Sequence, residues 1–145
     1  MAINSNEKGK TGELELARLL REYGYGEAKR SVQYNGKDGQ ADVLGLPHIH
    51  IECKRVEKLN IYNAIEQAKR DAKNNDLPAV FHRKNRCNWL VTMELDVFME
   101  IYKAYMNSQR QSDYIKRIQA IENQSKSIQV IENMERQIKE CKGNG

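Results

Sequence analysis

The chain has 145 residues, of which 39% are hydrophobic, enough for one domain whose core needs neither disulfides nor a structural metal, but too few for a second catalytic domain. Its three cysteines are odd in number and widely spaced, and no signal peptide or membrane-spanning apolar run is evident, so we expect a cytoplasmic protein with no membrane partner. The net charge of +4 permits nucleic-acid binding without requiring it.

Residues 13–23 are predicted to form the first helix, which Gly24 is predicted to end. The apolar residues at helical spacing are Leu16, Leu19, Leu20 and Tyr23. Glu13 lies one turn before this stripe, near the buried edge, where a carboxylate is costly without a partner. It is either a functional carboxylate or a first-turn acid favoured by the helix dipole.

Residues 28–34 are predicted to form a strand of mixed polarity, followed by a glycine-rich loop at 35–40 that is suited to a turn. Arg30 in the strand and Lys37 in the loop are candidate contacts to DNA phosphates. Solvated surface charge is the alternative for both residues, and it is the simpler interpretation of Lys37.

Residues 49–54 alternate strictly between apolar and polar side chains, which predicts a strand with one core face and one functional face. The apolar side chains are Ile49, Ile51 and Cys53, and the polar ones are His50, Glu52 and Lys54. Because the alternation turns Cys53 away from His50, we expect no zinc site here.

Asp42 lies in a short apolar strand predicted at residues 41–45, and antiparallel pairing with the next strand can bring it beside Glu52. Two carboxylates about 4 Å apart repel by roughly 4 kcal/mol at an effective dielectric constant near 20. The neighbouring Lys54 need not offset all of this repulsion. Mg²⁺ resolves this conflict, since it prefers one or two carboxylates with waters and phosphate oxygens, and it can activate water against a phosphodiester. The alternative is that these residues are surface charges on a strand.

Four further elements follow in the prediction. They are a polar helix at 60–74, strands at 77–82 and 88–92, and an amphipathic helix at 94–102. Arg55 precedes the first of these helices, and Gln67 lies beside its apolar stripe. The loop between the two strands carries three cations, Arg83, Lys84 and Arg86, which could hold DNA phosphates or could simply be solvated. The order helix, three strands, helix, two strands and helix is α/β.

From residue 107 the composition changes to glutamine, asparagine, serine, lysine and glutamate with isolated isoleucines. We therefore expect a globular domain at 1–106 and a polar helical C-terminal extension at 107–145. Ser125 and Glu135 interrupt its heptads, so a long helix is favoured over a regular coiled coil.

The spacing of Asp42, nine residues, and then Glu52-x-Lys54 resembles the PD-(D/E)xK nuclease superfamily. A longer pattern resembles the Hjc-type Holliday junction resolvases and their phage relatives over roughly residues 8–105. Its members are Lys8-Gly9, Glu13-x-Glu15-Leu16, Arg30-Ser31, Asp42 and Glu52-Cys53-Lys54. Two departures are Ala41, where the superfamily name expects proline, and the loop at 35–40, which lacks the serine of archaeal members.

This resemblance implies a restriction-endonuclease-like fold, with a mixed five-stranded sheet flanked by helices, and a metal-dependent DNA endonuclease. It implies that Asp42 and Glu52 bind Mg²⁺, for which Mn²⁺ should substitute, and that Lys54 lies near the nucleophile. A first-helix glutamate would complete the acidic site, Glu13 in preference to Glu15. It also carries over Gln67 as a helix residue that points at the site.

The resemblance further implies a homodimer that resolves four-way DNA junctions by hydrolysing phosphodiesters. The candidate DNA contacts are Arg30, Lys37, Arg55, Arg83, Lys84 and Arg86. Two alternatives stay open: a nuclease of the same fold that cuts linear duplex, flap or nicked DNA, and a noncatalytic DNA-binding protein that retains the fold.

Overall fold

The computed structural model describes residues 5–32 and 41–142. Its elements are α1 (Ser5–Glu22), β1 (Lys29–Arg30), β2 (Val43–Leu44), β3 (Ile49–Arg55), α2 (Ile61–Asp71), β4 (Leu77–Arg83), β5 (Leu90–Thr92) and α3 (Leu95–Lys142). Their order is the predicted one. The glycine-rich loop predicted at 35–40, with Lys37, lies outside the described residues.

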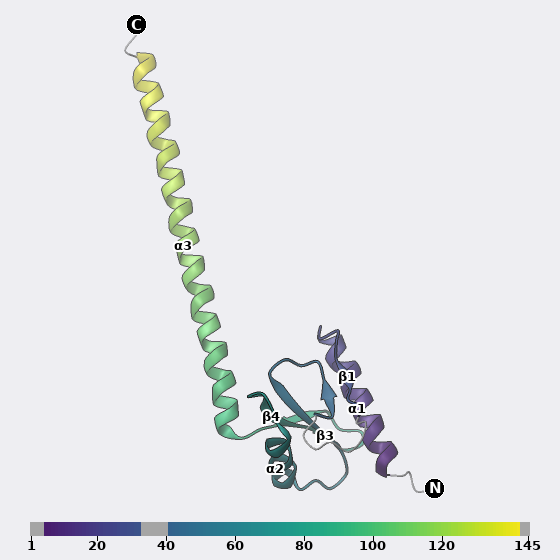
Figure 1. Ribbon diagram of the computed structural model, residues 1–145. Coiled ribbons are helices and arrows are strands. Elements are labelled where there is room, and N and C mark those ends of the chain that lie inside the picture. Colours follow the sequence, from purple (N-terminus) through teal and green to yellow (C-terminus); the bar gives the residue numbers. More distant parts are fainter. Residues whose placement is uncertain (1–4, 33–40, 143–145) are drawn as a thin grey trace. The chain divides into compact units, whose positions relative to one another are not determined.

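The strands form one five-stranded sheet in the order β1-β2-β3-β4-β5 (Figure 1). β1, β2 and β3 pair antiparallel in succession, β3 and β4 are parallel, and β5 returns antiparallel to β4. α2 makes the crossover that the parallel pair requires. The predicted α/β fold with a mixed five-stranded sheet is therefore confirmed.

Both faces of the central strand β3 are covered, because α1 and α2 pack on opposite sides of the sheet. Ile51 and Cys53 belong to the core that α1 covers, whereas Val80 of β4 packs against the apolar face of α2. His50 and Glu52 alternate onto the α2 face and are each only 3% exposed. The predicted alternation of β3 is confirmed, and its polar face is largely buried.

α1 begins at Ser5, eight residues before the predicted start at 13, and runs through Gly9 and Gly12. Glycine is a poor helix former, which is why the sequence favoured a later start. A Cβ added at Gly12 would lie 2.9 Å from the Cβ of Arg55, so glycine here allows α1 to approach β3 closely. The C-terminal end was predicted correctly: Gly24 has a φ of 98°, and the Tyr25 N–H donates to the Leu20 carbonyl in a Schellman motif.

A matched pair of alanine substitutions should reveal this close approach. A Cβ at Gly9 meets nothing within 4 Å, so Gly9→Ala should stabilise the protein by about 1 kcal/mol through helix propensity. Gly12→Ala gains the same propensity but must displace Arg55, so it should be about 1–3 kcal/mol less stable than Gly9→Ala. Urea unfolding of both variants measures the difference, and equal stabilities would contradict the contact.

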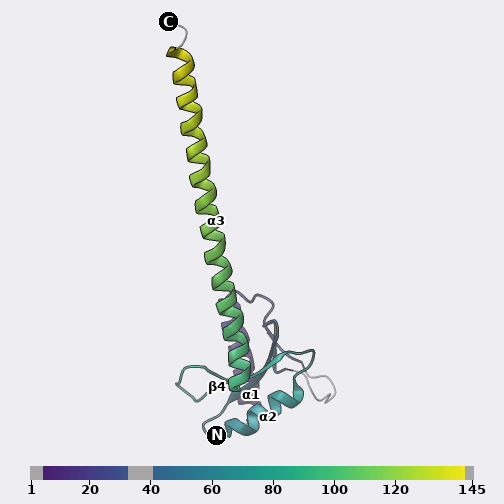
Figure 2. The same ribbon diagram turned by 90° about the vertical axis from the view of Figure 1, so that its left-hand side faces the viewer.

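α3 has 48 residues. Both views show it as one unbroken helix (Figures 1 and 2). The helix predicted at 94–102 and the extension predicted after 107 are therefore parts of one element. The chain divides into two compact units, Met1–Met99 and Glu100–Gly145, with the boundary inside α3. In the second unit, α3 exposes large apolar side chains such as Ile121 and Ile128. None of the helices in the described ranges is both long and apolar enough to cross a membrane.

Candidate active site

Asp42 and Glu52 are brought together by the pairing of β2 with β3. Val43 is the register partner of Ile51, and the Asp42 N–H donates to the Ile51 carbonyl at 2.9 Å. The Asp42 carboxylate then crosses to β3, where Oδ2 accepts a hydrogen bond from the Cys53 N–H at 2.8 Å. Backbone contacts thus hold this carboxylate beside Glu52, as the sequence led us to expect.

Burial raises the pKa of both carboxyl groups. The pKa of Asp42 is raised from 3.8 to about 6, first by burial and then by repulsion from Glu52, against the lowering effect of the Cys53 N–H bond. Burial likewise raises the pKa of Glu52, while its hydrogen bond with Lys54 lowers it. Lys54 lowers the pKa of both groups, but burial outweighs its effect.

Lys54 is held between Glu52 and α2. Its Nζ lies 2.5 Å from Glu52 Oε1 and donates to Gln67 Oε1 at 3.2 Å. Ala64 and Ala68 of α2 are buried against the sheet, and this packing turns Gln67 toward Lys54 at the edge of the interface. The structure therefore brings Asp42, Glu52, Lys54 and Gln67 into one cluster.

The two α1 glutamates have different surroundings. Glu13 forms an ion pair with Arg30 and is near enough to Asp42 and Glu52 to raise the pKa of each. Glu15 instead binds Arg83 and the Trp89 indole N–H with Oε1, the latter at 3.2 Å, while its Oε2 lies 3.4 Å from Arg55. Glu13 is thus the glutamate on the side of the carboxylate pair.

The structure places the predicted DNA-binding cations in two settings. Arg30 is paired with Glu13, and Arg55 and Arg83 share Glu15. Lys84 and Arg86 are exposed in the β4–β5 turn. The role of Glu15 as a shared partner was missed, because it depends on contacts between three distant elements.

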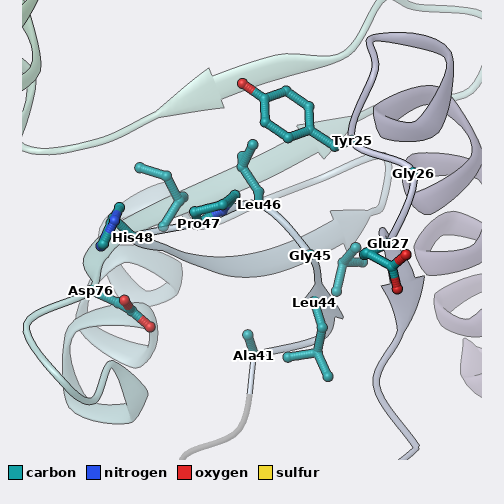
Figure 3. Close-up of a pocket in the computed structure, with 12 residues that line it drawn as sticks. Tyr25, Gly26, Glu27, Ala41, Leu44, Gly45, Leu46, Pro47, His48 and Asp76 are labelled. Carbon is teal, nitrogen blue, oxygen red and sulfur yellow. The ribbon is translucent and has the colours of Figure 1, made fainter.

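A hollow of about 450 Å³ lies at the other end of β3, around Leu44, Gly45 and Ile49 (Figure 3). Its lining is mainly apolar, and the carboxylates of Glu27 and Asp76 are its acidic groups (Figure 3). None of the predicted catalytic side chains lines it. An acidic, mainly apolar hollow does not suit a phosphodiester, so the candidate active site is the cluster around Asp42 and Glu52.

This cluster fits a hard divalent cation by its donors. It offers one buried and one half-buried carboxylate, whose pKa values are raised chiefly by burial, and Mg²⁺ prefers one or two carboxylates plus waters and phosphate oxygens. No group of three or more histidine, cysteine, aspartate or glutamate side chains in the described ranges is arranged to hold a metal ion. Glu13, the glutamate predicted to complete the acidic site, forms an ion pair with Arg30.

The mixed sheet with flanking helices, and the cluster of Asp42, just before β2, with Glu52 and Lys54 of β3, have the features of the PD-(D/E)xK class of nucleases. The model of one family, described as "Phage putative PDDEXK endonuclease", matches residues 4–144. The chain belongs to this phage PD-(D/E)xK endonuclease family. Among curated proteins and solved structures, none matches the chain.

Proposed function

We propose that this endonuclease is Mg²⁺-dependent and structure-selective, and that it resolves four-way DNA junctions by hydrolysing phosphodiesters. The observation that carries the metal dependence is the juxtaposition of the half-buried Asp42 and the buried Glu52, with Lys54 paired to Glu52. Membership of a nuclease family makes DNA the substrate. The choice of four-way junctions rests on the resemblance of the longer motif pattern to junction resolvases.

Asp42 and Glu52 would hold the cation in this proposal. When bound, Mg²⁺ polarises the phosphodiester and lowers the pKa of a coordinated water. The Lys54 ammonium is placed to orient the attacking water and to stabilise the negative charge that develops on the phosphate. Water attacks phosphorus, the bond to the leaving oxygen breaks, and that oxygen takes up a proton.

Two further residues act through these groups. Gln67 accepts a hydrogen bond from Lys54 at 3.2 Å and so fixes the direction of the ammonium group. Glu13 adds negative charge near the carboxylate pair, and its ion pair with Arg30 ties β1 to α1. We assign Glu13 to the site as an assisting carboxylate that acts directly or through water.

Resolution of a junction needs two cuts on opposing strands, and the described part of one chain offers one such cluster. We therefore propose a homodimer with two sites in a fixed relation, most simply around a twofold axis. Residues 1–106 would form the nuclease domain, and 107–145 would act in assembly or affinity.

The test compares a four-way junction with a linear duplex of the same sequence, each strand labelled in turn, in Mn²⁺ and in Mg²⁺. We expect paired, symmetric nicks on the junction under conditions where the linear duplex survives. The preference should persist when the arm sequences change, because shape and phosphate contacts would carry it. Equal cutting of linear duplex by a monomer would remove the junction assignment, and cutting of flaps or nicks alone would reassign the substrate.

A further inference from the structure

A second, smaller hollow of about 230 Å³ lies where α1 meets the end of β3 and the β4–β5 turn. Lys8 and Thr11 line it from α1, Arg55 from β3, and Asn85 from the turn. None of the four lining residues carries a carboxylate, and two are cations. This composition is the opposite of the acidic, apolar hollow at the other end of β3.

Three of the four residues that line this hollow have partners. Arg55 lies 3.4 Å from Glu15 and donates to Asn85 Oδ1 at 3.5 Å. Because Oδ1 of Asn85 faces Arg55, the side-chain nitrogen of Asn85 is its remaining polar group, and no hydrogen bond to it is found among the described residues. The Thr11 hydroxyl donates to the Glu7 carbonyl at 2.7 Å and so supplies no donor.

The surrounding charge favours an anion. Glu15 is shared between Arg55 and Arg83, so one carboxylate faces two guanidinium groups. Glu57 accepts the Asn85 backbone N–H at 3.1 Å. The region around the hollow thus holds three cations, which are Lys8, Arg55 and Arg83, and two carboxylates, which are Glu15 and Glu57. The exposed Lys84 and Arg86 lie in the same turn as Asn85.

The close approach of α1 to β3 places Lys8 at the hollow. Gly12 is the contact point, because a Cβ there would lie 2.9 Å from the Arg55 Cβ. Lys8 lies four residues before Gly12 on α1, so both residues share one face of the helix. The glycine thus sets the distance between the Lys8 ammonium and the Arg55 guanidinium.

We propose that this hollow binds a phosphate of the DNA strand that flanks the cut, with Lys8 and Arg55 as its charges and Asn85 as a donor. Glu15 is the positioning residue that orients Arg55. Arg55 follows Glu52 by three residues, about 10 Å along a strand that rises about 3.3 Å per residue. A phosphate bound here would therefore lie within a few nucleotides of the cut. This assignment rests on the proposed DNA endonuclease.

The experiment measures binding of a labelled four-way DNA junction to the full chain over a range of salt concentrations, with Asp42→Asn present in every protein to prevent cleavage. The logarithm of the binding constant falls linearly with the logarithm of the salt concentration. Loss of one phosphate contact should decrease the steepness of this slope by about 0.9. We expect this decrease for Lys8→Gln. Lys10→Gln is the matched control, because Lys10 is exposed on the same helix, does not line the hollow and carries the same charge.

Ethylation of single phosphates tests the position. Blocking one phosphate of the junction, within a few nucleotides of the cut that the wild type makes, should weaken binding of the parent protein and have no further effect on Lys8→Gln. Equal slopes for Lys8→Gln and Lys10→Gln would overturn the assignment, as would a parent protein that binds no DNA. If the wild-type chain cleaves DNA but the two slopes are equal, only the hollow is wrong. If it cleaves nothing but Lys8→Gln alone lowers the slope, only the nuclease proposal is wrong.

Discussion

Asp42→Asn and Glu52→Gln should each lower the rate of DNA cleavage by about 10³-fold or more. A bound metal ion contributes several kcal/mol of transition-state stabilisation, and about 1.4 kcal/mol corresponds to a tenfold change in rate. Each substitution removes one of the two carboxylates that would hold the cation. Single-turnover cleavage in Mg²⁺ measures the loss, and unfolding in urea shows that the variants are folded.

Asp76→Asn is the matched control for these two variants. Asp76 is an aspartate of the same unit, but it lines the apolar hollow at the other end of β3 (Figure 3). It changes the net charge by the same amount as Asp42→Asn and should leave cleavage near the wild-type rate. If either Asp42→Asn or Glu52→Gln retained the wild-type rate at equal metal concentration, the assigned ligand pair would be wrong.

Asp42→Asn should stabilise the metal-free protein, and the gain should depend on pH. The carboxyl group has a pKa of about 6 in the folded state against 3.8 as its ordinary value, so the folded state binds the proton more tightly. The stability from this group is therefore present below pH 4 and is lost as pH rises through 6. Because a tenfold difference in proton affinity corresponds to about 1.4 kcal/mol, the loss above pH 6 is about 3 kcal/mol.

Asparagine does not ionise and avoids this loss. In EDTA, Asp42→Asn should exceed the wild type by about 2–3 kcal/mol at pH 8, and the difference should fall to about half at pH 5. Urea unfolding at the two pH values measures both quantities. Millimolar Mg²⁺ should then stabilise the wild type and not the variant, because ligand binding to the folded state adds to its stability. A gain that did not change between pH 5 and pH 8 would show that repulsion and burial at Asp42 are not its cause.

The parts of the site that sequence predicted well depend on local periodicity. Alternation along β3 was sufficient to separate Glu52 and Lys54 from Cys53, and the helical stripe of α2 was sufficient to place Gln67 at its edge. The short apolar strand and turn before β3 predicted that Asp42 would pair beside Glu52. In each case, side chains a few residues apart follow the geometry of a single strand, helix or hairpin.

The parts that sequence could not predict depend on contacts between distant elements. The low helix propensity of glycine led to a predicted start of α1 that was too late. The packing of Gly12 against Arg55, which explains the glycine at this position, joins two elements that are distant in sequence. The pairing of Arg55 and Arg83 with Glu15 joins residues of α1, β3 and β4. Neither spacing nor charge pattern indicated that a single glutamate would orient two predicted DNA-binding arginines.

The most direct measurement is a Mg²⁺ titration of DNA cleavage by the full chain, with wild type and Asp42→Asn compared on the same labelled substrate. We expect no cleavage by the wild type in EDTA, nicking that rises and saturates with Mg²⁺, and no recovery by Asp42→Asn at any Mg²⁺ concentration that saturates the wild type. Equal cleavage by both proteins, or cleavage by the wild type in EDTA, would contradict a metal-dependent nuclease site at Asp42 and Glu52.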